Sequence, residues 1–299
     1  MENTNKKSEV VEYKNVLNDV PFKSFTEADF NVFFSIILLA KSKFDRGNIE
    51  KDDKGNFKIV LDYSDIKKLS GLAKNHIKNQ DFHDKYLRGM TAKLQSINGT
   101  ITSHNGKIAD DIVIFPRFRR NLEDATLTAF LTDEFYKLLY DYNRIEFTQL
   151  EFKRFIRLES KYTKTLFRKL SQFKTTGKYV VKQDEFRELF DVPKTYRQTD
   201  IMRRIINPAV EELSKDFKNL KCELHHAPKP GAPVDRYTFT FAKPKKEQKK
   251  TIEGQGVFTF GDNNEVSYEG LKQRKQTDFH KFEQNNISYA DLEDDLLDN

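Results

Sequence analysis

The chain has 299 residues, a length that suits two ordinary domains better than one. Charged residues make up 33% and hydrophobic residues 37%, and the 26 Phe and 12 Tyr supply enough apolar surface for two cores. A single cysteine excludes an intramolecular disulfide and a cysteine-rich zinc site, and the polar start and short apolar runs predict a cytoplasmic protein with no membrane partner.

Positive charge is concentrated in one part of the chain. Residues 145–242 carry 20 Lys and Arg against 13 Asp and Glu, a net charge of +7, whereas the tail from 243 to 299 has a net charge of −3. Such a basic segment favours a polyanionic partner, because neutralising phosphates releases condensed counterions. A solvated lysine-rich surface is the alternative, and charge alone does not decide between the two.

The first half begins with a pattern typical of a helix start. Thr26 followed by Asp29 resembles a capping box and opens a helix with one apolar face. A strand over 58–63 and a short helix capped by Ser64 and ended by Gly71 are predicted next. A longer helix over about 79–97 has apolar residues spaced by three or four, which are Phe82, Tyr86, Met90, Leu94 and Ile97.

Two strands, 99–102 and 111–115, follow that helix and are joined by a turn containing Asn105-Gly106, a strong hairpin signal that we interpret as the wing. A further strand over 126–131 and a helix capped by Thr132 close the first half.

The second half repeats this order. The predicted elements are helices over about 159–175, 183–190 and 199–216, with strands over 179–181, 221–226 and 236–241. Gly177 ends the first of these helices, and Pro208 lies inside the third, where we expect a kink rather than a break.

Helix, strand, helix, turn, helix, strand, loop, strand is the order of a winged helix, and it occurs twice at an offset of about 120 residues. We therefore predict an α+β protein of two tandem winged-helix (helix-turn-helix) domains. The expected boundaries are an N-terminal arm over 1–22, a first domain over 23–144 for dimerisation and backbone contacts, a second over 145–242 for sequence-specific DNA binding, and a disordered tail over 243–299. The basic start of that tail suits nonspecific contact with DNA, whereas its acidic end either docks on a partner or only keeps the chain soluble.

In a helix-turn-helix the second helix enters the major groove of DNA. Here that helix carries Arg203 and Arg204 on its expected outer face, and arginine matches the O6 and N7 acceptors of guanine. Ion pairs with glutamates further along the helix are the alternative, but the favourable spacing of three or four residues argues against them. The preceding turn contributes Lys194, Tyr196 and Arg197.

Other cations are candidates for contacts with phosphate groups. In the second domain these are Lys164, Arg168 and Lys169 on the helix over 159–175 and Arg236 on the wing. In the first domain they are Lys78, Lys85, Arg88, Arg117, Arg119 and Arg120. The charges of the first domain have two readings that remain equally open, since they either hold DNA or are merely solvated on a dimerisation domain.

Enzymatic chemistry is not expected. A nicking enzyme of the rolling-circle type needs a metal-binding histidine pair and a nucleophilic tyrosine, but His225 and His226 are adjacent on a strand and should point to opposite faces. Glycine-rich nucleotide-binding motifs are absent from the sequence. We predict no catalytic residues, no metal and no cofactor.

Three runs in the second half resemble the second domain of the iteron-binding plasmid replication initiators. They are L-E-S-K-Y-T-K-T-L-F-R-K-L, D-E-F-R-E-L-F-D-V-P-K-T-Y and M-R-R-I-I-N-P-A-V-E-E-L, all within 158–241. The first domain is similar mainly in the order of its elements.

This resemblance implies two winged helices that bind direct repeats at a theta-type plasmid origin as monomers and dimerise to repress their own promoter. It implies that Arg203 and Arg204 occupy the basic positions of the recognition helix, with Tyr196 and Arg197 in the turn before it. It also implies opening of an adjacent AT-rich region and recruitment of the host initiator and helicase. A winged-helix transcriptional regulator without replication activity remains the alternative.

Overall fold

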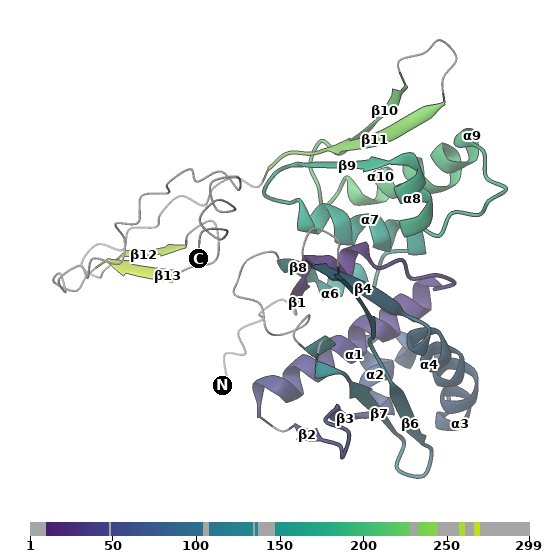
Figure 1. Ribbon diagram of the computed structural model, residues 1–299, viewed down its shortest axis with the longest axis vertical. Helices are drawn as coiled ribbons and strands as arrows, with labels where there is room; N and C mark the ends of the chain where they lie inside the picture. The colour runs from purple at the N-terminus through teal and green to yellow at the C-terminus, as the bar shows by residue number, and fades with distance from the viewer. Residues whose placement is uncertain are drawn as a thin grey trace, which may run out of the picture. The chain divides into compact units, whose positions relative to one another are not determined.

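The computed structural model describes residues 10–47, 49–103, 108–133, 135–136, 147–227, 233–243, 257–260 and 266–269. The chain divides into two compact units, Met1–Pro244 and Lys245–Asn299. The first unit contains both winged helices (Figure 1). In the second unit the backbone of two paired strands is described, β12 (Val257–Phe260) and β13 (Val266–Glu269), and the rest of the predicted disordered tail lies outside the described residues.

The first winged helix begins with α1 (Glu27–Asp45). Its capping box is present as predicted, because the Thr26 side chain accepts a hydrogen bond from the backbone of Asp29 while the Asp29 carboxylate accepts one from the backbone of Thr26. The elements that follow are β2 (Glu50–Lys51), β3 (Phe57–Asp62), α2 (Tyr63–Leu69), the 3-10 turn Leu72–Asn75, and the composite long helix α3 (Asn79–Asp81), η3 (Phe82–Leu87) and α4 (Arg88–Gln95).

The wing of this domain is not the hairpin that the sequence suggested. The predicted strands 99–102 and 111–115 do pair, as β4 (Asn98–Ser103) and β5 (Ile108–Val113), but they form a separate two-stranded ribbon. The domain's main sheet has the order β2-β3-β7-β6, in which β6 (Arg117–Asn121) pairs with β7 (Thr126–Leu131). β6 and β7 therefore take the place of the wing, and the ribbon is an insertion before them.

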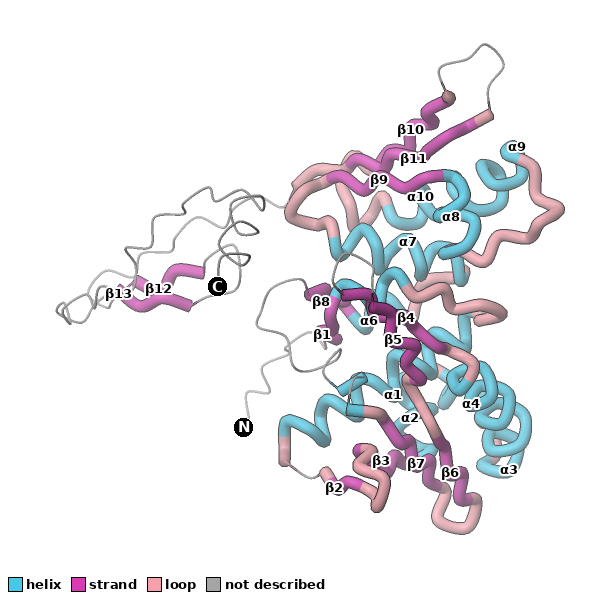
Figure 2. The backbone as a smooth tube through the Cα atoms, in the orientation of Figure 1, coloured by secondary structure: helices cyan, strands magenta, loops and turns pink. Residues whose placement is uncertain are grey.

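The second winged helix has the same plan without an insertion. Its elements are α7 (Lys161–Gln172), β9 (Lys178–Lys182), α8 (Gln183–Leu189), the composite long helix α9 (Gln198–Ile201), η4 (Met202–Ile206) and α10 (Asn207–Leu213), and the strands β10 (Lys221–His226) and β11 (Val234–Thr240). The sheet order is β10-β11-β9, which matches β6-β7-β3 of the first domain. Figure 2 shows the strands of this sheet beside the helices of the domain.

The turn between α7 and β9 requires glycine. Gly177 has φ +69°, and a Cβ atom there would come within 2.7 Å of the carbonyl oxygen of Phe241. The predicted end of the helix at this residue thus has two physical causes, a left-handed backbone and the close approach of the chain that leaves β11.

The N-terminal segment, expected to be an arm, belongs to the folded core. Its strand β1 (Val10–Lys14) pairs antiparallel with β8 (Phe147–Glu151), which precedes the short helix α6 (Phe152–Phe155). A 3-10 turn, η1 (Asn15–Asp19), follows β1. The side chains of Val11, Tyr13 and Leu17 are fully buried, so this segment ties the start of the chain to the beginning of the second winged helix.

Both long helices contain one π turn, η3 and η4. In the second domain the π turn lies just before Pro208, which is in the first turn of α10, and the helix continues beyond it, so the proline does not break the helix. In the first domain the π turn occurs without a proline. Among the described residues, no helix is long and apolar enough to cross a membrane.

Candidate nucleic-acid interface

Hydrogen bonds from α8 and β11 fix the start of the composite helix Gln198–Leu213. At its start, the Asp200 carboxylate accepts a hydrogen bond from the backbone nitrogen of Arg197, at 3.2 Å. The turn before it is fixed by Arg187 of α8, which donates to the carbonyl oxygen of Tyr196 at 2.8 Å, and Tyr237 of β11 donates to the side-chain oxygen of Gln198, also at 2.8 Å. The helix is therefore anchored by its first turn while the opposite face is exposed.

Two arginines project from that exposed face. The side chains of Arg203 and Arg204 are 72% and 53% exposed, and each lies close to the carboxylate of Asp200, at 3.3 Å and 3.5 Å. The Arg204 guanidinium also lies 5.3 Å from the centre of the Tyr196 ring. Exposed ion pairs of this kind contribute only about 0–1 kcal/mol, so Asp200 orients both arginines without preventing them from binding another acceptor.

The ion pairs weighed from the sequence involved the wrong acid. Glutamates further along the helix are not the partners, and Asp200, three and four residues before the arginines, is. The sequence could have indicated this partner. An aspartate three residues after the start of the helix is typical of a capping box, and it lies one helical turn before both arginines.

Other predicted residues of this surface are also accessible. Lys194 and Arg197 are exposed in the turn before the recognition helix. Arg236, on β11, is 54% exposed and pairs with its neighbour Asp235 at 2.9 Å. The tip of this wing lies outside the described residues. Lys194, Arg197 and Arg236 are therefore accessible cations of the same winged helix as the two helix arginines.

Three predicted phosphate ligands of α7 are buried instead. The residues Lys164, Arg168 and Lys169 expose 0%, 1% and 5% of their surface. They point from α7 into the first winged helix and the N-terminal segment, so the expectation that they bind phosphate is wrong for the chain in this structure. Helical periodicity alone does not predict this burial, because the long stems of basic side chains can be buried wherever carbonyl groups and aromatic rings contact the charged end.

Each of these buried cations has specific partners. Lys164 donates to the carbonyl oxygen of Phe155 at 2.6 Å, and burial lowers its pKa to about 7, an effect that nearby Glu27 opposes. Arg168 donates to the carbonyl oxygen of Leu17 at 2.5 Å.

The guanidinium of Arg168 also lies within 4.6–5.9 Å of the centres of three rings, those of Phe22, Phe30 and Phe34. Lys169 pairs with Asp19. The three cations thus join the two winged helices, and the fold needs them for a purpose other than DNA.

In the first winged helix, the long helix presents three exposed cations. Lys78 stands at its start, Lys85 pairs with Asp81 at 2.9 Å, and Arg88 follows the π turn. All three are accessible, as the sequence predicted, and they form the matching surface of the first domain.

The arginine cluster of the first domain is divided between structure and solvent. Arg117 lies over the Phe130 ring at 3.8 Å and pairs with Asp52 at 3.6 Å. Arg120 donates to the carbonyl oxygen of His83 at 3.0 Å, which fixes β6 to the long helix. Arg119 points to the exposed side. Arg119 and Arg117, whose side chain is 52% exposed, are therefore the accessible members of this cluster.

Within the described residues there is no group of three or more His, Cys, Asp or Glu side chains that could hold a metal ion. His225 and His226 are both exposed on β10, with a shift of strand register between them.

Two family models match the chain, and together they span almost all of the first unit. The first, described as "Initiator Replication protein, WH1", covers residues 10–171, and the second, "Initiator Rep protein, WH2", covers residues 182–241. The chain belongs to the family of initiator replication proteins. Both models are named for winged-helix domains, as the fold shows, and the first of them extends over most of α7.

Two individual proteins are similar to this chain and support its assignment to the family. A "Probable replication protein rep" from Bifidobacterium longum (strain NCC 2705) is 26% identical over 238 residues, which are 79% of this chain and 73% of that protein. A solved structure described as "Crystal structure of Pi initiator protein in complex with iteron DNA" matches with a TM-score of 0.54 and 14% identity, covering 80% of this chain and 99% of the other. At this identity the second match supports the fold of the initiator.

Proposed function

We propose that this initiator starts plasmid replication in the cytoplasm by binding direct repeats, or iterons, in double-stranded DNA at its origin. The second winged helix reads base edges with Arg203 and Arg204, while Lys194, Arg197 and Arg236 hold the backbone on either side. Support comes from the family and from the Pi initiator, whose solved structure contains iteron DNA.

The proposal rests on the exposure and orientation of Arg203 and Arg204. They are exposed in the first turns of a helix whose start is fixed by hydrogen bonds, and Asp200 and Tyr196 limit their freedom before DNA arrives. Side chains oriented in this way lose little entropy on binding, and each good arginine–guanine pair supplies about 1–3 kcal/mol of discrimination.

In this proposal the first winged helix contacts the DNA backbone and mediates dimerisation. Its exposed cations on the long helix and Arg119 contact the backbone of the next part of the repeat, and the same domain joins two copies of the chain when the promoter is repressed. Bound copies then open an adjacent AT-rich segment and recruit the host initiator and helicase. No catalytic step by this chain is needed for these events.

Binding to DNA from around the initiator's own gene tests the proposal. Fluorescence anisotropy at physiological salt should show a preference of about 10³-fold or more for a duplex with direct repeats over a scrambled duplex. Arg203→Ala should weaken binding to the repeat by about 1–3 kcal/mol and relax the base preference at one position. Lys215→Ala, which changes an exposed cation just beyond α10, is the matched control and should bind like the unchanged chain.

A plasmid that carries only the gene and its flanking DNA extends the test to replication. It should be maintained with the unchanged gene and lost with Arg203→Ala. Equal, salt-sensitive binding to both duplexes would reject sequence-specific recognition. Specific binding and repression without maintenance of the plasmid would identify a transcriptional regulator instead.

A further inference from the structure

Strand β9 forms one edge of the sheet in the second winged helix, since the order is β10-β11-β9 among the described residues. The carbonyl oxygen of Gly177 accepts a hydrogen bond from the backbone nitrogen of Phe241 at 3.0 Å, which shows that the odd-numbered residues of this segment face β11. The backbone groups of the even-numbered residues, Lys178, Val180 and Lys182, therefore face away from the sheet.

Side chains satisfy this free edge at its two ends only. The hydroxyl of Thr176 donates to the carbonyl oxygen of Lys178 at 3.3 Å, and the Glu185 carboxylate accepts from the backbone nitrogen of Lys182 at 3.4 Å. Between these ends, Val180 presents one N–H and one C=O outward, the pattern that an additional strand requires. The side chain of Val180 is also 46% exposed.

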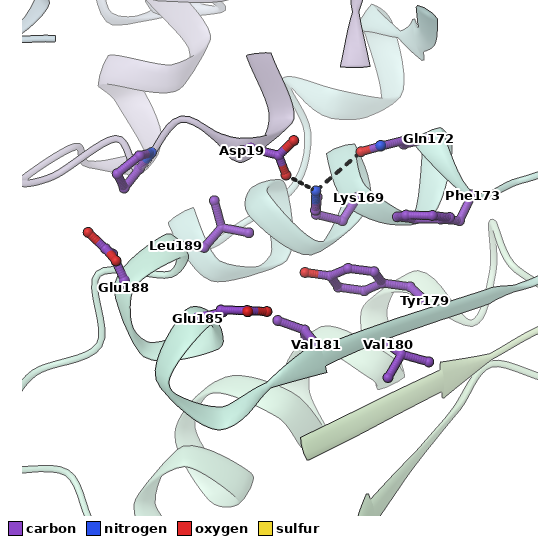
Figure 3. Close-up of a pocket in the computed structure, with 11 residues that line it drawn as sticks. Asp19, Lys169, Gln172, Phe173, Tyr179, Val180, Val181, Glu185, Glu188 and Leu189 are labelled. Carbon is purple, nitrogen blue, oxygen red and sulfur yellow. Dashed lines mark hydrogen bonds and ion pairs between the residues drawn. The ribbon is translucent and has the colours of Figure 1, made fainter. Parts of the chain in front are cut away.

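A cavity of about 530 Å³ runs along this edge (Figure 3). Its lining residues come from η1 and the segment after it, from α7, from β9 and from α8, and are Asp19, Pro21, Lys169, Gln172, Phe173, Tyr179, Val180, Val181, Glu185, Glu188 and Leu189. The volume suits several side chains rather than a single water molecule.

The wall of the cavity contains the hydroxyl group of a largely buried tyrosine. Tyr179 is 4% exposed, its hydroxyl points into the cavity in Figure 3, and no hydrogen bond to that hydroxyl occurs within the described residues. Burial raises the pKa of Tyr179, so the hydroxyl remains protonated and can donate or accept. The other polar groups beside it are occupied, because the ammonium of Lys169 pairs with Asp19 and Gln172.

The rim is negative although the domain around it is positive. Glu185 and Glu188 are both exposed on α8, and the nearest cation to Glu188, Lys23, is 3.8 Å away with both side chains about two-thirds exposed. A phosphate backbone would be repelled here, whereas a lysine or arginine side chain would find two carboxylates and the Tyr179 hydroxyl.

We propose that this cavity binds an extended, basic segment of a partner protein, which adds to the sheet as a fourth strand beside β9. The segment pairs its backbone with the N–H and C=O of Val180 and places a lysine or arginine side chain against Glu185 and Glu188. Backbone pairing supplies affinity, and the acidic rim selects the partner. Arg203 and Arg204, which are proposed to read the bases, do not line this cavity, so loss of one function leaves the other measurable.

Labelled synthetic peptides test the site on the full chain. The probe is an alternating Lys/Val peptide of about seven residues, long enough to pass β9 at the ~3.3 Å rise of a strand. The comparison peptide has Glu in place of each Lys. Fluorescence anisotropy should show binding of the basic peptide at least about tenfold tighter than that of the acidic one.

Two matched pairs of variants separate backbone pairing from charge. Val180→Pro removes the outward N–H without removing a bond to β11 and should weaken the basic peptide at least about tenfold, whereas Val180→Thr should not. Glu188→Lys should weaken it by a similar factor, whereas Glu211→Lys, on α10, should not. Thermal unfolding of each variant checks that the fold is retained, and the two glutamate variants keep the test valid if Val180→Pro does not fold.

Binding of both peptides alike, or of neither, would overturn the proposal. Sensitivity to Glu188→Lys without sensitivity to a folded Val180→Pro would reduce the site to general charge attraction and would also overturn strand addition. The preference for direct-repeat over scrambled DNA should be retained in all four variants, so failure of this proposal is distinguishable from failure of the DNA-binding function.

Discussion

Arg168 offers the sharpest test of how the two winged helices are joined, and we compare its replacement by methionine with its replacement by alanine. The guanidinium is 1% exposed and donates one hydrogen bond, to Leu17. Its Nε and Nη1 atoms are buried without a hydrogen-bond partner in the described part of the chain. Burial also lowers the pKa of this arginine, with opposing contributions from Tyr13 and Asp19.

For Arg168→Met, the losses and gains in the free energy of unfolding nearly cancel. Arg168→Met loses a hydrogen bond of a charged group, about 1.5–3 kcal/mol, and the attraction to three phenylalanine rings, up to about 2 kcal/mol. It also removes two unpaired buried donors, which cost about 1–3 kcal/mol each, and fills a similar volume. The free energy of unfolding should change by less than about 2 kcal/mol. Arg168→Ala adds a cavity and should be about 2–5 kcal/mol less stable than Arg168→Met.

Urea unfolding followed by circular dichroism measures both differences, and anisotropy with direct-repeat DNA is measured on the same samples. The folded methionine variant should bind DNA like the unchanged chain. If Arg168→Met instead lost about tenfold in DNA affinity at unchanged stability, Arg168 would be a phosphate ligand and the buried position would be refuted. Equal stability of the two variants would refute the packing argument.

Two further predictions concern α7. Because burial lowers the pKa of Lys164 to about 7 from its usual 10.5, the unfolded chain holds a proton that the folded chain has released, and the free energy of unfolding should rise between pH 7 and 9 by up to about 1.4 kcal/mol per pH unit. Lys164→Met should flatten that rise in urea titrations at several pH values, and an unchanged slope would contradict it. Ser160→Ala should cost about 1 kcal/mol in thermal unfolding, because the Ser160 hydroxyl accepts from the backbones of Tyr162 and Thr163; no measurable loss would show that the cap is dispensable.

The parts of the fold that the sequence predicted well depend on neighbours along the chain. The capping box at Thr26 and the left-handed turn at Gly177 are local, and both are present. The repeated order of elements is a sum of such local signals, so the two winged helices followed from the sequence and are confirmed by the family models. Exposure of Arg203 and Arg204 followed from helical periodicity in the same way.

The wing of the first domain depends on pairing that the sequence does not show. R-F-R-R-N at 117–121 has the composition of a basic loop, and it becomes a strand because each residue pairs with β7, as Arg119 does with Thr128. The Asn105-Gly106 signal correctly predicted a hairpin, but nothing local distinguishes a wing from an inserted ribbon. The structural contact of Arg120 was missed for the same reason, since its carbonyl partner in the long helix is distant in sequence.

The buried cations of α7 were missed because the partners of two of them lie far away in the sequence. A helix with lysine and arginine at 164, 168 and 169 favours a solvated face if only its own sequence is considered. The acceptors of Arg168 and Lys169 are the carbonyl of Leu17 and the carboxylate of Asp19, some 150 residues away, and the acceptor of Lys164 is the carbonyl of Phe155. Only a fold that closes the N-terminal segment over α7 brings them together.

The π turn of the first domain, by contrast, leaves a mark in the pattern of apolar residues, whereas that of the second does not. In the first long helix the buried apolar positions are 82, 87, 90 and 94, and in the second they are 201, 205, 206, 209 and 213, so only the first helix has a step of five between neighbouring buried apolar positions. A step of five residues is the signature of one extra residue in a helical turn. Tyr86, expected to point inward, is 38% exposed for this reason, and Leu87 is buried in its place.

The presence of a π turn in both long helices indicates that Pro208 does not cause the π turn of its helix. The first domain has Gly89 at the corresponding position and makes the same turn. Pro208 instead occupies a site just after the π turn, at the first turn of α10, where a missing N–H is tolerated.

Pro208→Ala should therefore change the free energy of unfolding by less than about 1 kcal/mol, as urea titration would measure. A gain near the ~3 kcal/mol cost of proline in a regular helix interior would show that the proline does distort this helix and would contradict the argument.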